Sequence, residues 1–98
     1  MPHLLVFVHN VSTHYVYLLK SKKNGRLYTG YTSDLKKRMK DHQSGKSPYT
    51  KNNRPYVLVY YEAYASKSDA QKRERSLKLR SNAHTQLRKR IESSIHES

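Results

Sequence analysis

Two short segments flank a Lys-Lys-Asn-Gly sequence and limit the folds that this chain can adopt. Residues 15–19 and 26–29 are mostly aromatic, β-branched or leucine, as strands prefer. Between them, the Asn24-Gly25 pair tolerates the positive φ angles of a type I′ turn. The pattern predicts a β-hairpin near the N-terminus, and a hairpin needs further strands or helices to cover its apolar side chains.

The rest of the chain predicts three helices and one more strand. Apolar spacing favours a first helix that Gly45 ends, and residues 56–63 have the richest β composition, which predicts a central third strand. A second helix is expected from Ser66 or Ser68 to about residue 80, and a third from Asn82, its predicted N-cap. The order β-β-α-β-α-α predicts an α+β domain, with a three-stranded antiparallel sheet flanked by helices.

Length limits the chain to one domain. With 98 residues, we expect residues 14–98 to form that domain and residues 1–13 to form an N-terminal extension. The apolar residues 4–8 are too few for a signal peptide or a membrane span, so we interpret them as an extra strand or a loosely attached leader.

Charge points to an anionic partner. The chain has twenty Lys and Arg and seven Asp and Glu, which give a formal charge of +13, so nucleic acid is the expected partner. A membrane surface fits less well, because the chain has no Trp and one Phe. The absence of cysteine excludes disulfides, thiolate zinc sites and a Cys nucleophile, and it suits a cytoplasmic location.

Arg38 and His42 lie one helical turn apart, so they share a face of the first helix. A guanidinium matches the oxygens of a phosphate and can stabilise the charge of a pentavalent transition state, while an imidazole can relay a proton near neutral pH. The alternative is a solvated basic helix face with an incidental histidine.

Tyr17 and Tyr28 lie on the two arms of the hairpin, where they can meet across the strands. A phenol beside a cation can orient or deprotonate water, although packing alone also explains tyrosines at such positions. Gly30 suggests a place where the backbone must bend or where it approaches another group closely.

Glu74 is an isolated acid within the basic sequence QKRERSLKLR. It can be the single protein ligand of Mg²⁺ or Mn²⁺, or it can form a surface ion pair with Lys78 four residues on. Glu62, late in the third strand, is the rival metal ligand.

These residues together resemble the GIY-YIG nuclease family, especially its small single-domain bacterial (UPF0213-like) members. Residues 15–17 (YVY) resemble the GIY element and residues 28–30 (YTG) resemble YIG, with Tyr15, Val16 and Thr29 departing from the letters of the motif. The string at 28–42 then places Arg38 and His42, and the one at 70–78 places Glu74, where the family carries its catalytic and metal-binding residues.

The resemblance implies a metal-dependent endonuclease that hydrolyses phosphodiester bonds. It implies Tyr17 as the general base, helped by Tyr28 and His42, with Arg38 stabilising the transition state and Glu74 holding one Mg²⁺ or Mn²⁺. We expect DNA as the substrate, with a structure or single-strand preference and little sequence specificity.

Other basic and aromatic residues are expected to track the nucleic-acid backbone. They are Lys37, Lys46, Tyr49, Lys51, Arg54, Arg73 and Lys78. The alternatives left open are a non-catalytic nucleic-acid-binding module on the same fold and a small basic ribosome- or membrane-associated protein. Many family members also carry a late asparagine, for which Asn82 is the nearest candidate.

Overall fold

A computed structural model describes residues 12–79 and 81–98, so the predicted extra strand or leader at residues 4–8 lies outside the described residues. The elements, in chain order, are β1 (His14–Ser21), β2 (Leu27–Thr32), α2 (Leu35–Ser44), the 3₁₀ turn η1 (Lys51–Asn53), β3 (Tyr56–Tyr64), α3 (Lys67–Lys78), α4 (Asn82–Arg90) and α5 (Glu92–His96). The predicted α+β class and the order of strands and helices are confirmed, with η1 as an addition.

The sheet is antiparallel in the order β2-β1-β3, so β1 is its central strand. The prediction that residues 56–63 form the central strand was wrong. Residues 16–19 of β1 are all buried because helices cover both faces of this strand, whereas Tyr61 of β3 is 53% exposed. β composition identified both strands, but both contain an uninterrupted run of apolar and aromatic residues, so composition alone does not tell which of them is central.

The hairpin between β1 and β2 is present, but its turn is longer than the predicted type I′ turn. The Ser21 N–H donates to the Arg26 carbonyl at 2.8 Å, which leaves residues 22–25 as a four-residue loop. Gly25 has a φ of 75°, and the buried Ser21 hydroxyl accepts the N–H groups of Lys23 and Asn24 at 3.2 Å. Hydrogen bonding by Ser21 therefore favours the longer loop.

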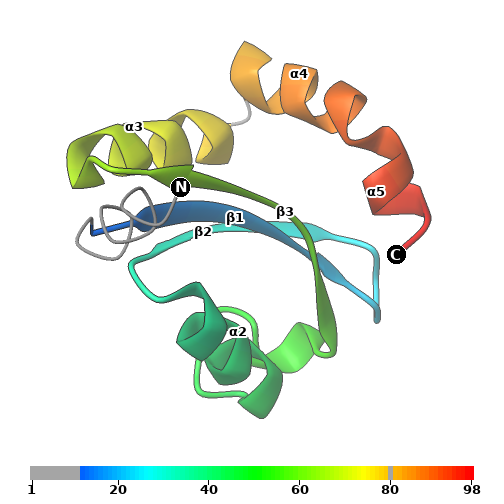
Figure 1. The fold of residues 1–98 in the computed structure, drawn as a ribbon. Coiled ribbons are helices and arrows are strands. Elements are labelled where there is room, and N and C mark those ends of the chain that lie inside the picture. The colour runs from blue at the N-terminus through cyan, green and yellow to red at the C-terminus, as the bar shows by residue number, and fades with distance from the viewer. Residues whose placement is uncertain (1–11, 80) are drawn as a thin grey trace, which may run out of the picture.

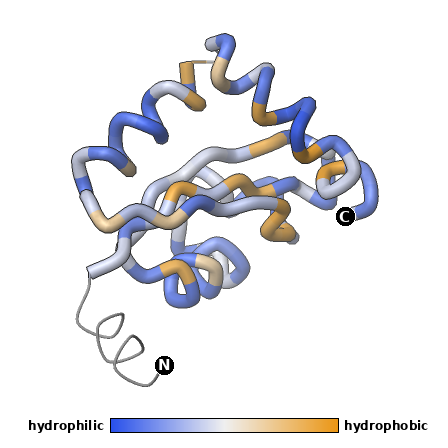
Figure 2. The backbone as a smooth tube through the Cα atoms, turned by 45° about the horizontal axis from the view of Figure 1, so that its top comes forward, coloured by the Kyte–Doolittle hydropathy of each residue, from blue (hydrophilic) through white to orange (hydrophobic). Residues whose placement is uncertain are grey.

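Helices cover both faces of the sheet, α2 on one face and α3, α4 and α5 on the other (Figure 1). Between the sheet and α3–α5 lies an aliphatic core that includes Val16, Leu18 and Leu77, whereas the α2 face packs Tyr17 and other aromatic residues. In Figure 2 the hydrophobic positions lie along the strands and on the helix sides that face them, while the outer sides are mostly hydrophilic. The two faces of β1 therefore have different environments.

The helix ends follow ordinary capping chemistry. The Asp34 carboxylate accepts the Lys37 N–H at the start of α2, and Gly45, with a φ of 84°, ends that helix as predicted. The predicted third helix is instead two short helices, which meet at Ile91, and the N-cap of α4 is Ser81 rather than Asn82. Among the described residues, no helix combines the length and apolar character needed to cross a membrane.

Candidate active site

Tyr17 lies directly opposite Gly30 in the β1–β2 pairing, and its side chain is 1% exposed. A Cβ atom at position 30 would lie 2.4 Å from Cζ of Tyr17 and closer still to its hydroxyl. Such a contact is impossible without moving the ring. The predicted close approach at Gly30 is therefore confirmed, and the approaching group is the Tyr17 phenol.

His42 is fully buried between two hydroxyl groups. Its Nε2 is hydrogen-bonded to the Tyr17 hydroxyl and its Nδ1 to Thr50 Oγ1, each at 2.8 Å. The Tyr28 ring lies beside it, with centroids 5.2 Å apart. A neutral imidazole has one donor and one acceptor nitrogen, so Thr50, His42 and Tyr17 form a directed hydrogen-bond chain. His42 is thus not the incidental, solvated histidine of the alternative interpretation.

The site holds its two aromatic groups uncharged at neutral pH. Burial raises the pKa of the Tyr17 phenol to about 12, although hydrogen bonding by Arg38 acts to lower it. Burial, followed by the positive charge of Arg38, lowers the pKa of His42 to about 4. Both pKa shifts keep the ring in question neutral unless a bound ion changes the local charge.

Arg38 lies at the open side of this chain on α2. Its side chain is 32% exposed, and its contacts with the loop and with its own helix are long: Nη2 is 3.5 Å from Ser47 Oγ, and Nη1 is 3.8 Å from the Asp41 carboxylate. Although burial acts to lower the pKa of Arg38, hydrogen bonding to Tyr17 raises it above its ordinary value, so the guanidinium stays charged. Arg38 therefore retains donors for an anionic ligand.

Glu74 comes to the same region from α3, and its negative charge acts on the Tyr17 phenol, where it raises the pKa. The predicted ion pair with Lys78 is also present, with Lys78 Nζ 3.2 Å from Glu74 Oε2. The five predicted catalytic residues are thus brought together from β1, β2, α2 and α3.

Glu74 fits the requirements of a single Mg²⁺ or Mn²⁺ ion. Its hard carboxylate oxygens already face one cation, the Lys78 ammonium. Within residues 12–79 and 81–98, no group of three or more His, Asp or Glu side chains could enclose a metal ion. A divalent ion held here would take its other ligands from water and from the substrate, as Mg²⁺ commonly does.

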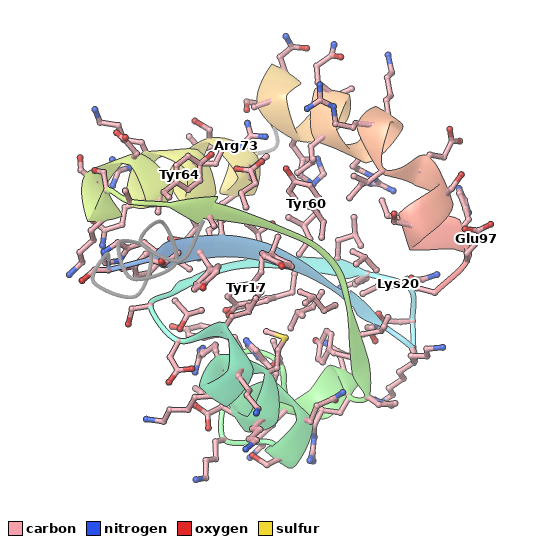
Figure 3. All side chains as sticks on the ribbon, viewed as in Figure 1. Tyr17, Lys20, Tyr60, Tyr64, Arg73 and Glu97 are labelled. Carbon is pink, nitrogen blue, oxygen red and sulfur yellow. The ribbon has the colours of Figure 1, made fainter. Side chains whose placement is uncertain are left out.

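Glu62, the rival metal ligand, lies on the opposite face of the sheet, where three side chains hydrogen-bond to it. Figure 3 labels these three, Tyr60, Tyr64 and Arg73, on the α3 side of the strands. Both tyrosine hydroxyls donate to its carboxylate at 2.5 Å, and the Arg73 guanidinium donates at 2.9 and 3.0 Å. With its oxygens saturated, Glu62 is a structural anion rather than a metal ligand. Arg73, predicted to bind nucleic acid, has its guanidinium engaged here.

The remaining predicted nucleic-acid-binding residues are on the surface. Tyr49 is 83% exposed, and Arg54 donates to the carbonyls of Lys51 and Gln43, which ties the loop to the end of α2. The other exposed residues of this set are Lys37, Lys46, Lys51 and Lys78.

Sequence reasoning missed Thr50 and Ser47, both buried hydroxyl residues that contact His42 and Arg38. Neither has a sequence signal, because a serine or threonine in a polar loop is ordinary. Their roles depend on how the loop folds back onto α2.

Comparison with known proteins places these residues in a family. A UPF0213 protein of Staphylococcus haemolyticus is 49% identical over 69 residues, which cover 69% of this chain and 83% of that protein. A UPF0213 protein of Staphylococcus saprophyticus is 48% identical over 66 residues, or 66% and 79% of the two chains. The solution NMR structure of a UPF0213 protein from Bacillus halodurans is 41% identical, covers 76% of this chain and 80% of that one, and gives a TM-score of 0.49.

The sequence model of the GIY-YIG catalytic domain matches residues 13–90, which include all five residues of the candidate site. Since this match spans most of the chain, the protein belongs to the GIY-YIG family of nucleases.

Proposed function

We propose that this protein is a metal-dependent endonuclease that hydrolyses phosphodiester bonds, in DNA with a structural or single-strand preference and with little sequence specificity. The observation that supports this most is the Tyr17 phenol, which lies over Gly30, is hydrogen-bonded to His42, and is subject to the charges of both Arg38 and Glu74. Packing alone does not require an arginine and a glutamate at the same phenol.

Arg38 is the group that binds the scissile phosphate. Its loose contacts with Ser47 and Asp41 leave donors available, and its fixed charge stabilises the extra negative charge that develops as water attacks phosphorus. Arginine suits this role because its planar fork matches two phosphate oxygens at once.

Tyr17 receives the proton of the attacking water. In the free protein its pKa of about 12 makes it a poor base, and His42, with a pKa of about 4, is a poor proton acceptor. An anionic phosphate beside Arg38 offsets the positive charge that contributes to the low pKa of His42. Substrate binding therefore makes it easier for the Tyr17 proton to shift toward His42 as Tyr17 takes one from water.

Thr50 fixes the orientation and the tautomer of the His42 ring. With Nδ1 protonated and donating to Thr50 Oγ1, Nε2 presents a lone pair to the Tyr17 hydroxyl. Thr50 is a positioning residue, because it acts on the reaction only through His42.

Glu74 is the ligand for one Mg²⁺ or Mn²⁺. The bound ion supplies charge stabilisation for the phosphate and the leaving oxygen. Lys78, which contacts Glu74 in the absence of metal, can turn toward the nucleic-acid backbone when the carboxylate takes up the ion.

The exposed loop between α2 and β3 contributes backbone affinity through Lys46, Lys51 and Tyr49, and Lys37 adds a charge on α2. Contacts of this kind hold phosphates and stack on bases without reading sequence. Absence of cysteine from the sequence suits action in a reducing cytoplasm.

The proposal is tested by incubating the protein with labelled single-stranded, duplex and branched DNA and with RNA, in Mg²⁺, Mn²⁺ or EDTA. We expect cleavage that requires the metal and is lost in Glu74→Ala, while Glu92→Ala, which removes an exposed acid from α5, cleaves like the wild type. Binding by Glu74→Ala, measured in EDTA, separates lost chemistry from lost affinity.

Tight, metal-independent binding with no cleavage of any substrate would instead favour the second candidate, a nucleic-acid-binding module. The charge of +13 supports that alternative as well as the first, so salt-sensitive binding does not separate the two.

A further inference from the structure

A basic groove runs from the candidate active site along β2 toward the hairpin loop. Its first part, about 160 Å³, is lined by Tyr28 and neighbouring residues of β2 together with Lys78 and His84. Its second part, about 520 Å³, is lined by Arg26 and the hairpin loop on one side and by His84 and Arg88 of α4 on the other. The two parts share Leu27 and His84, so they adjoin each other, and together they are called the groove.

Two arginines that line the groove form none of the ion pairs that stabilise the described part of the chain. Arg26 and Arg88 are exposed, and neither takes part in the ion pairs found among residues 12–79 and 81–98. No Asp or Glu is among the described residues that line either part. Two unneutralised guanidinium groups that face each other across a groove attract an extended polyanion.

The position of the groove relates it to the catalytic residues. It begins at Tyr28 and Lys78, which belong to the candidate site, and Arg26 lies four residues before Gly30 along the strand. At about 3.3 Å per residue, Arg26 is on the order of 13 Å from the glycine under the Tyr17 phenol. That separation corresponds to a few nucleotides of an extended strand.

We infer that this groove binds the phosphodiester backbone of the substrate strand on one side of the scissile bond, with Arg26 and Arg88 contacting phosphates beyond the active site. The inference rests on the proposed function for the identity of the ligand. It gives the substrate a second contact region in addition to the loop that carries Lys46 and Lys51.

The double variant Arg26→Gln/Arg88→Gln tests this. Binding of labelled single-stranded oligodeoxynucleotides of increasing length is measured in EDTA, so that no cleavage occurs, at several salt concentrations. Loss of two phosphate contacts should lower the slope of log K against log salt by about 1.4 and weaken binding on the order of tenfold at about 0.1 M salt. The deficit should be full for long oligonucleotides and absent for those too short to reach beyond the active site.

Lys67→Gln/Lys72→Gln is the matched control, because it removes the same charge from exposed positions on α3 that line neither part of the groove. Arg26→Lys/Arg88→Lys keeps the charge and should retain most of the binding. Equal losses in the Arg26/Arg88 and Lys67/Lys72 variants, or a deficit independent of oligonucleotide length, would overturn the inference. Thermal unfolding of each variant checks that the fold is intact.

Failure of this inference and failure of the proposed function are distinguishable. A protein that cleaves DNA but shows no specific loss in the Arg26→Gln/Arg88→Gln variant keeps the function and loses the groove. A protein that never cleaves, yet shows the length-dependent loss, loses the nuclease function and keeps the groove as a binding surface.

Discussion

The two faces of the sheet each bury ionisable side chains, but they treat charge in opposite ways. On the α3 face, Glu62 is charged and fully compensated, with hydrogen bonds from Arg73, Tyr60 and Tyr64 that keep its pKa low despite burial. On the α2 face, Tyr17 and His42 are hydrogen-bonded to each other and held neutral. The first arrangement is complete within the chain, whereas the second changes when an external charge arrives.

This difference separates a structural cluster from the candidate active site. A buried acid with a lowered pKa in a basic protein invites a functional interpretation, yet both oxygens of Glu62 accept hydrogen bonds. Arg38, in contrast, has loose partners and faces two phenols. A partly exposed charged group with hydrogen-bond donors still available, such as Arg38, is therefore a better indicator of the candidate site than a shifted pKa.

Loss of Arg38 should give the largest effect on the α2 face. In Arg38→Ala we expect kcat to fall on the order of 10²- to 10³-fold, because the transition state loses its main positive charge. Arg38→Lys should recover little, since it lacks the fork geometry. Lys36→Ala, an exposed cation on the same helix, should stay close to the wild type in a cleavage assay. A similar loss in both alanine variants would make Arg38 a general binding charge only.

Acid should destabilise the α2 face first. His42 has a folded pKa of about 4 against an ordinary value of 6.5, so the unfolded chain binds its proton more readily between these values. The contribution of neutral, buried His42 to the free energy of unfolding is complete above pH 6.5. Roughly 3 kcal/mol of that free energy is lost as the pH falls to about 4. Glu62, whose pKa is lowered, adds a further loss only below about pH 4.5.

Urea unfolding across this pH range measures the effect. His42→Gln should flatten the loss between pH 6.5 and 4, while replacement of the exposed His96 with glutamine should leave the curve unchanged. An unchanged slope in His42→Gln would assign the acid sensitivity to other groups.

Removal of the charge on Glu62 should damage stability and spare chemistry. Glu62→Gln leaves the partly buried Arg73 without its counter-ion, and we expect a loss of about 2 kcal/mol in the free energy of unfolding. Cleavage per folded molecule should change little at a temperature where the variant is folded. A large fall in kcat at full folding would place the Glu62 cluster in the catalytic machinery, against the contrast drawn above.

Thr50→Val should give the smallest effect and the most specific one. Valine has nearly the same shape as threonine but lacks the hydroxyl, so the His42 ring loses its Nδ1 partner. We expect kcat to fall about tenfold with little change in KM. Thr50→Ser should restore activity, because it keeps the hydroxyl. Equal defects in both variants would indicate a packing role for the methyl group instead.

The sequence predicted the hairpin, the end of the first helix at Gly45, and the close approach at Gly30, because each depends on local chemistry. The five catalytic residues were proposed from their resemblance in order and spacing to the family, and their roles stay predictions. Residue types alone did not reveal the central position of β1 or the four-residue loop held by Ser21. Burial of Glu62 and the contact of Thr50 with His42 also depend on which segments far apart in the chain come together, and a single sequence does not record that.

Because of the contact between Tyr17 and Gly30, the residue types at two positions thirteen residues apart constrain each other. The phenol fills the volume that a side chain at position 30 would need, so a substitution of the glycine clashes while the tyrosine is present. In a lineage that lost the tyrosine, and with it the proposed catalysis, this clash would be absent, and we expect position 30 to accept ordinary β-sheet residues. Paired loss of the two residues would therefore mark descendants that keep this fold without its chemistry.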